Sequence, residues 1–180
     1  MNYEAIEYPE AQANLGGLRS VGYYGFITDA SVIPDVPVDP AALQDVSVIT
    51  SNIIMKSGKY MNAMYGTLEK LNLKGELQGE RDGRSSKITL VWVIPNHHKE
   101  NLGAARYFPK RRMFFIVRDH EGRYRLVGNM YFPAEVAATD DTGTAVADLK
   151  HVSYEITTFS DGPAPIYEGE IPSLDDSSAV

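Results

Sequence analysis

The sequence predicts a mainly β protein, an antiparallel β-sandwich or barrel with one short helix and extended terminal arms. Short segments rich in β-branched and aromatic side chains recur along the chain, which is typical of strands. Fifteen glycines and ten prolines separate these segments and favour turns over long helices. A length of 180 residues suits one domain. We therefore expect an N-terminal arm over residues 1–19, one β domain over residues 20–171 and a C-terminal tail over residues 172–180.

The first part of the β domain contains strands and an extended connection. Residues 20–28 are rich in aromatic side chains and predict a first strand, with close backbone approaches at Gly22 and Gly25. Three prolines between residues 34 and 40 enforce an extended, non-helical path. Residues 46–55 are β-branched and predict a second strand.

The next stretch is ambiguous in its first half. Residues 61–71 have the composition of a helix, whereas residues 71–79 alternate between apolar and polar side chains and favour a strand. A polar loop is expected over residues 79–86, where Asp82 and Gly83 form a turn signal. Residues 87–94 are apolar on both faces, which predicts a central strand that is buried on both sides and contains Trp92.

The second half gives the clearest element predictions. Residues 96–107 predict a helix with Asn96 as its cap, although Gly103 weakens it. Two apolar runs on either side of a polar turn predict a hairpin over residues 112–127. Further strands are expected at residues 130–136, 150–159 and 165–171, with a loop at residues 139–143. In the strand at 150–159, even-numbered residues from Val152 to Thr158 form one face.

Composition excludes several classes of protein. The absence of cysteine removes disulfide frameworks, thiolate zinc sites and cysteine nucleophiles. The acidic start has neither the basic nor the apolar region of a signal peptide. The apolar runs at residues 90–94 and 113–117 are too short to span a bilayer. We expect a soluble protein made in a cytoplasm, without a membrane partner.

Candidate catalytic and metal-binding groups are weak. His97 and His98 are adjacent and point in different directions, without a third ligand at a recognised spacing. Ser153 follows His151 on one strand face, but no strained glycine elbow surrounds the serine. Residues 56–59 lack the spaced glycines of a phosphate loop. We therefore predict no enzymatic activity, no metal and no cofactor.

The distribution of charge is more informative than the formal net charge of −7. Residues 97–127 contain 8 basic and 3 acidic side chains, whereas residues 128–180 contain 1 basic and 10 acidic ones. A solvated surface explains such runs, but so does complementarity between copies of the chain, since charge patterns steer association. Under the second interpretation, the residues expected at a subunit interface are Arg106, Lys110, Arg111, Arg112, Arg123, Arg125, Asp140, Asp141, Asp175 and Asp176.

The basic cluster at residues 110–112 follows two aromatic residues, Tyr107 and Phe108. Basic grooves with stacking rings bind single-stranded nucleic acid. However, residues 113–117 predict a buried strand directly afterwards, so we expect the two rings to close the edge of the core. The cluster then favours salt-dependent contact with another protein chain over contact with nucleic acid.

The second half resembles a known family of structural proteins. The resemblance covers residues 85–171 and rests on the hairpin at 113–126, Val127-Gly128, Thr142-Gly143-Thr144, the alternating strand at 152–158 and the segment Gly162-Pro-Ala-Pro-Ile-Tyr167. Together these features resemble the tail-tube and connector-ring structural proteins of tailed bacteriophages, particularly phages of gut Bacteroidota.

The resemblance implies a virion structural protein. Copies would form a ring, a hexamer or higher, around a DNA channel, and would contact adjacent virion tail or connector proteins. DNA would pass through without specific binding, and the protein would be located in the virion tail after assembly in the host bacterial cytoplasm. The alternative function is a non-enzymatic β-sandwich module that binds a ligand or carbohydrate.

Overall fold

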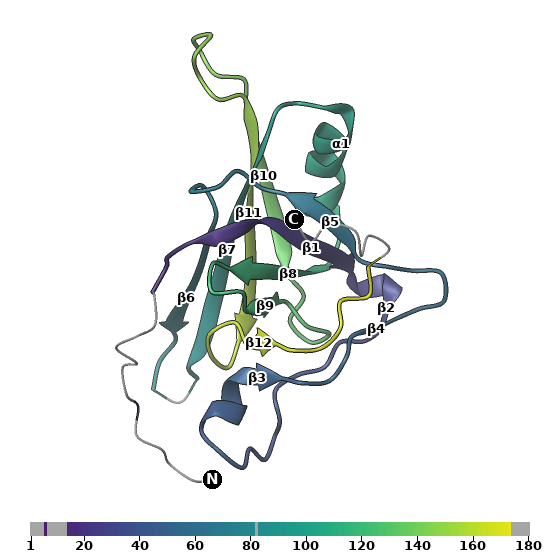
Figure 1. The fold of residues 1–180 in the computed structure, drawn as a ribbon, viewed down its shortest axis with the longest axis vertical. Coiled ribbons are helices and arrows are strands. Elements are labelled where there is room, and N and C mark those ends of the chain that lie inside the picture. The colour runs from purple at the N-terminus through teal and green to yellow at the C-terminus, as the bar shows by residue number, and fades with distance from the viewer. Residues whose placement is uncertain (1–5, 7–13, 82, 174–180) are drawn as a thin grey trace.

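The computed structural model describes residue 6, residues 14–81 and residues 83–173. This part of the chain is mainly β, with one α-helix and three short 3-10 helices (Figure 1). The strands form a six-stranded sheet, a four-stranded sheet and a two-stranded sheet. The mainly β prediction is therefore confirmed, and the sheets do not close into a barrel.

The six-stranded sheet has the strand order β3-β12-β9-β8-β1-β5. All pairs are antiparallel except β12 with β3, which run parallel. Its members are β1 (Leu18–Phe26), β3 (Val48–Ile49), β5 (Asn62–Tyr65), β8 (Met113–Asp119), β9 (Tyr124–Val127) and β12 (Ile166–Tyr167).

The four-stranded sheet is wholly antiparallel and has the order β10-β11-β7-β6. Its members are β6 (Asn72–Gln78), β7 (Ser85–Pro95), β10 (Glu135–Asp141) and β11 (His151–Ser160). The remaining elements are β2 (Ala30–Val32), β4 (Ile54–Met55), α1 (Lys99–Tyr107), η1 (Ile27–Asp29), η2 (Gln44–Ser47) and η3 (Phe108–Lys110).

One hydrophobic core lies between the two larger sheets. Trp92 from β7 and Tyr154 from β11 pack there with Phe115 and Val117 from β8. Even-numbered residues of β11 from Val152 to Thr158 are buried, as the alternation predicts. The architecture is thus a sandwich, the first of the two predicted alternatives.

A second core lies on the other face of the six-stranded sheet. Phe114 and Ile116 from β8 pack there with Ile49 and Tyr167, in a cluster to which residues 30–55 and 167–171 contribute. Strand β8 is therefore the strand that is buried on both faces. The prediction that residues 87–94 are doubly buried is wrong, since β7 alternates between buried and half-buried positions over most of its length.

Several element predictions are confirmed. The hairpin over residues 112–127 is β8–β9, the strand at 71–79 is β6 and the strand at 150–159 is β11. The helix forms over Lys99–Tyr107, but its N-cap is His98. Asn96 adopts a left-handed φ of 69°, and its backbone carbonyl accepts a hydrogen bond from the Asn101 side chain.

The ambiguous stretch at residues 61–71 forms strand β5 followed by a loop, and no helix. Other element predictions are wrong. Residues 46–55 break into η2, β3 and β4, so they form no single strand. The strand expected at 130–136 lies instead at Glu135–Asp141 and takes up much of the loop expected at 139–143. The last strand is only two residues long.

The terminal arms are described only in part. Strand β1 begins at Leu18, inside the expected N-terminal arm, and Ser173 pairs with Met61 inside the expected tail. Most of residues 1–13 and all of residues 174–180 lie outside the described residues. No helix in the described part of the chain is long and apolar enough to cross a membrane.

Candidate functional site

The four-stranded sheet leaves two edges for contact with another chain. Among the described strands, β6 pairs only with β7 and β10 pairs only with β11. Two backbone hydrogen bonds between Met113 and Ala134 close this edge just before β10 begins. An unpaired edge presents backbone N–H and C=O groups that can pair with a further strand.

The outer face of this sheet is polar. Lys74 and Glu76 of β6, Thr89 of β7 and Glu155 of β11 occupy the positions opposite to the core. This alternation leaves one face for the core and one for water. The sheet can therefore gain strands at its edges while its outer face stays in contact with solvent.

The hairpin β10–β11 projects beyond the rest of the molecule (Figure 1). Asp148 orders its tip, because its carboxylate accepts hydrogen bonds from the backbone N–H groups of Thr144 (2.8 Å) and Ala145 (2.7 Å). These two bonds lower the pKa of Asp148. Val146 at the tip is fully exposed. The tip is thus a structured, acidic arm with an apolar end.

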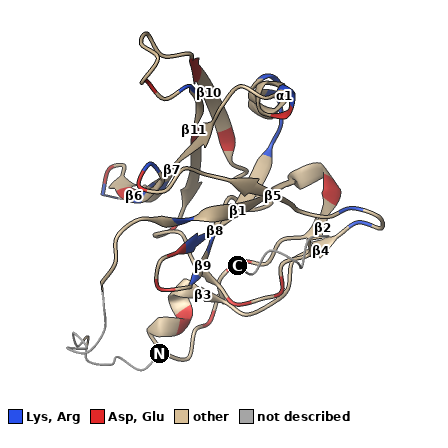
Figure 2. Cartoon of the chain, turned by 45° about the horizontal axis from the view of Figure 1, so that its top comes forward, with Lys and Arg blue, Asp and Glu red and all other residues tan. Residues whose placement is uncertain are grey.

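Exposed cations gather on α1, on η3 and on the two residues after η3 (Figure 2). They are Lys99, Arg106, Lys110, Arg111 and Arg112. Arg111 stacks on the ring of Tyr107, with its guanidinium carbon 4.7 Å from the ring centroid. The three ion pairs within the described residues involve none of these cations. We call these five residues the basic end.

Aromatic packing holds the basic end against the sandwich. Phe108 is buried and contacts Tyr24 and Tyr154, with ring centroids 4.9 Å and 5.9 Å away. The Tyr154 hydroxyl donates to the Asn101 side-chain oxygen (2.7 Å) and so anchors α1. Burial raises the pKa of Tyr154 to about 12. As expected, Phe108 closes the core, whereas Tyr107 stays half exposed.

The structure places the predicted interface residues in two groups. Arg106, Lys110, Arg111 and Arg112 belong to the basic end, and Asp140 and Asp141 lie on the projecting hairpin at the same end of the molecule (Figure 2). Arg123 and Arg125 lie on or beside β9, away from that end. Asp175 and Asp176 lie outside the described residues.

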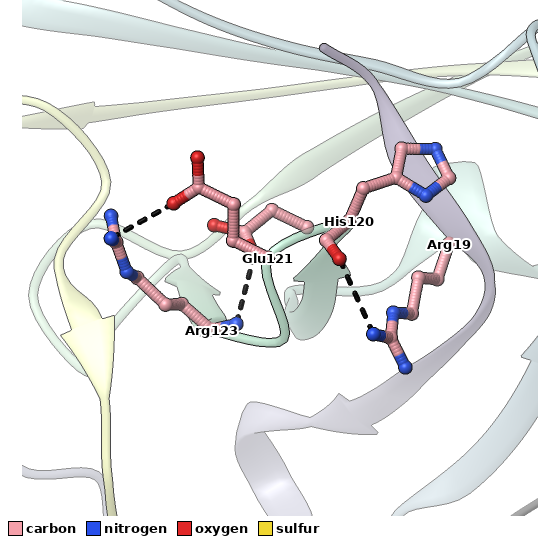
Figure 3. A network of polar contacts seen from close by, with 5 residues as sticks. Arg19, His120, Glu121 and Arg123 are labelled. Atoms are coloured by element: carbon pink, nitrogen blue, oxygen red, sulfur yellow. Dashed lines mark hydrogen bonds and ion pairs between the residues drawn. The ribbon is translucent and has the colours of Figure 1, made fainter. Parts of the chain in front are cut away.

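The second group makes contacts within the chain. Arg123 pairs with Glu121 at 2.8 Å (Figure 3). The half-buried Arg125 donates from Nε to the Ala164 carbonyl at 2.8 Å, and its burial lowers its pKa. The basic segment at residues 97–127 is therefore one stretch of sequence but two separate surfaces.

Sequence reasoning missed two features of the site. The open edges could not be recognised, because edge position depends on which strands pair across the sheet. The acidic arm was missed because residues 135–141 alternate weakly and the turn chemistry of residues 139–143 favoured a loop.

A small pocket is lined by residues that include parts of β6 and β9. Its volume is about 170 Å³, and Lys74, Asp119 and Arg125 are among its lining residues. No aromatic side chain lines it. Pockets for drug-sized ligands have volumes of about 300–1,000 Å³. This pocket suits only a small polar group.

Comparison of the chain with known protein families, with curated proteins and with solved structures finds no match.

Proposed function

We propose that this chain is a structural subunit that assembles with copies of itself into a ring or tube, as a tail-tube or connector-ring protein of a tailed-phage virion. The observation that carries the proposal is the four-stranded sheet with its two open edges, β6 and β10. The resemblance of residues 85–171 to such proteins supports the virion assignment.

The direction of the strands suits edge-to-edge assembly. Each step across the sheet from β6 to β10 is antiparallel, so β10 runs opposite to β6. A neighbouring copy related by rotation can therefore place its β6 beside β10 and continue the antiparallel alternation. Such a contact is heterologous. It closes into a ring when a whole number of equal rotations between neighbouring copies adds up to a full turn.

Charge supports the same assembly. The basic end and the acidic hairpin present opposite charges at one end of the molecule (Figure 2). In an assembly, the cations of one copy would face the carboxylates of the next. Exposed ion pairs are screened by salt, so this contribution would weaken at high ionic strength.

The net charge is compatible with a DNA channel. Affinity of proteins for DNA comes largely from Lys and Arg contacts to phosphate. A ring of subunits that each carry a net charge of −7 would let DNA pass without holding it.

The first test is the native mass of the purified protein over a series of salt concentrations, with negative-stain images of each species. We expect rings or tubes that loosen as salt is raised. A chain that remains a monomer of 19.9 kDa at high concentration and low salt would contradict the proposal.

Crosslinking tests the strand contact itself. The chain has no cysteine, so a variant with Glu76→Cys on β6 and Thr139→Cys on β10 carries two defined thiols. A short bismaleimide should convert this variant into covalent oligomers. The matched control combines Glu76→Cys with Lys56→Cys, which lies outside both edges, and should give far fewer of them.

The alternative function, a non-enzymatic module that binds a ligand or carbohydrate, has one supporting observation. The pocket beside Lys74 and Arg125 could accept a small polar group. Carbohydrate sites commonly use an exposed aromatic platform, whereas Trp92 is buried. A monomer that binds small ligands with no tendency to assemble would favour this alternative.

A further inference from the structure

Two arginines converge on the turn of the β8–β9 hairpin. Gly122 in this turn has a φ of +96°. A Cβ placed on Gly122 would lie 3.4 Å from Nη2 of Arg118 and 3.9 Å from Nη2 of Arg19. Both guanidinium groups therefore face the same point in space, although Arg19 comes from β1 and Arg118 from β8.

Backbone carbonyls hold both side chains in place. Arg19 donates from Nη2 to the carbonyl of His120 at 3.3 Å, and Arg118 donates from Nε to the carbonyl of Gly122 at 3.0 Å. The guanidinium carbon of Arg118 also lies 5.0 Å from the centroid of the Tyr124 ring. A guanidinium has five N–H donors, so each arginine keeps donors for a ligand.

The nearby carboxylates are engaged elsewhere in the turn. Asp119 accepts a hydrogen bond from the backbone N–H of Arg123 at 2.8 Å, and Glu121 pairs with the Arg123 side chain. Figure 3 shows Glu121 and Arg123 on one side of the turn and Arg19 on the other. Within the described residues, neither Arg19 nor Arg118 forms an ion pair. In the described part of the chain, these two like charges therefore approach each other with no carboxylate at ion-pair distance from either.

Glycine at position 122 keeps the space between the two guanidinium groups open. A side chain at this position would occupy that space, and the positive φ also disfavours any other residue. The planar donor fork of arginine matches the oxygens of a phosphate group.

We propose that Arg19 and Arg118 bind a phosphate group of a small ligand beside Gly122. Two cations suit a single phosphate group. A nucleic-acid backbone would require a longer row of basic side chains, and Arg123 in the same turn is already paired with Glu121. This site is independent of the proposed assembly, since it uses neither the open edges nor the basic end.

The test is a titration of the full chain with inorganic phosphate at constant ionic strength, followed by the NMR signals of the arginine Nε–H groups. We expect saturable shifts of the Arg19 and Arg118 signals. The variants Arg19→Gln and Arg118→Gln should each lower the affinity about tenfold, since each loses a charge-assisted hydrogen bond.

The matched control is Arg84→Gln, which removes the same charge from the exposed loop between β6 and β7, where Arg84 forms no ion pair within the described residues. Its affinity for phosphate should stay within about twofold of the wild type, since it loses only long-range attraction. The thermal unfolding temperature of each variant establishes that it is folded. Unchanged affinity in both folded test variants, or an equal loss in the control, would overturn the proposal.

A second arm uses a ten-nucleotide oligothymidine to identify the source of the phosphate. A small-ligand site predicts that the oligonucleotide binds no more tightly than inorganic phosphate. Binding more than a hundredfold tighter, lost in the Arg19→Gln and Arg118→Gln variants, would instead assign the phosphate to a nucleic-acid backbone and overturn the small-ligand assignment.

Discussion

Tyr154 shows how one buried polar group positions a surface. Its ring belongs to the core between the sheets, while its hydroxyl donates to Asn101 of α1. Asn101 in turn donates to the backbone carbonyl of Asn96 at 2.7 Å. The chain of contacts from β11 to the loop before α1 fixes the helix that carries Lys99 and Arg106 of the basic end.

Replacing Tyr154 by Phe should lower the free energy of unfolding by about 1–2 kcal/mol, because the buried oxygen of Asn101 loses its donor. Urea denaturation at neutral pH measures the change. The control is Tyr131→Phe. Tyr131 is 84% exposed, so loss of its hydroxyl should change the free energy of unfolding by less than about 0.5 kcal/mol.

The same variant should change the alkaline stability of the protein. The pKa of Tyr154 is about 12 in the folded chain and 10 when unperturbed, so the unfolded state loses its proton first as pH rises. Stability is therefore retained below pH 10 and falls between about pH 10 and 12. The fall should be shallower in Tyr154→Phe, though not abolished, because burial also raises the pKa of Tyr24 and Tyr167. An unchanged slope would contradict this assignment.

At the scale of elements, two glycines have opposite roles. A Cβ on Gly22 of β1 would lie 2.8 Å from Cη2 of the fully buried Trp92, so this strand packs closely only with glycine there. A Cβ on Gly103 in the middle of α1 would meet nothing within 4 Å. The close approach predicted at Gly22 is thus confirmed.

Replacing Gly22 by Ala should destabilise the protein by about 1–3 kcal/mol through overpacking. The matched change Gly103→Ala should stabilise it by about 0.5–1 kcal/mol, because alanine reduces the entropy that the helix loses on folding. Thermal and urea unfolding of both variants measure the difference. Equal effects of the two changes on the free energy of unfolding would show that the close contact between Gly22 and Trp92 does not cause the loss of stability.

Periodicity predicted those elements whose local pattern agrees with their final environment. The alternation of residues 152–158 matches β11 because one face meets the core and the other meets solvent. Residues 61–71 stayed ambiguous because their composition suits a helix as well as a strand. Their true state, a short strand beside β1 followed by a loop, depends on pairing with a distant strand.

At the scale of the whole molecule, reversing the basic end tests whether it contributes to assembly. The double variant Arg111→Glu and Arg112→Glu should impair ring or tube formation while the monomer stays folded. Both side chains are exposed, so the unfolding temperature should change little. Native mass and negative-stain images of the variant check the prediction.

The control for this experiment is Lys56→Glu with Lys70→Glu, which makes the same change in net charge at exposed sites in other loops. Assembly of the control should be close to that of the wild type. Normal assembly of the Arg111 and Arg112 variant would remove these residues from the interface. Equal loss in both variants would instead point to the net charge.

The sequence by itself determined the mainly β class, the β8–β9 hairpin, the burial of Trp92 and the opposite charges of two neighbouring segments. These properties follow from local alternation, turn chemistry and composition. Only the tertiary structure decided that β8, and not β7, is buried on both faces, because distant residues cover the outer side of the six-stranded sheet alone. It also decided which strands remain at the edges and which arginines meet, since both depend on pairings between residues far apart in the chain.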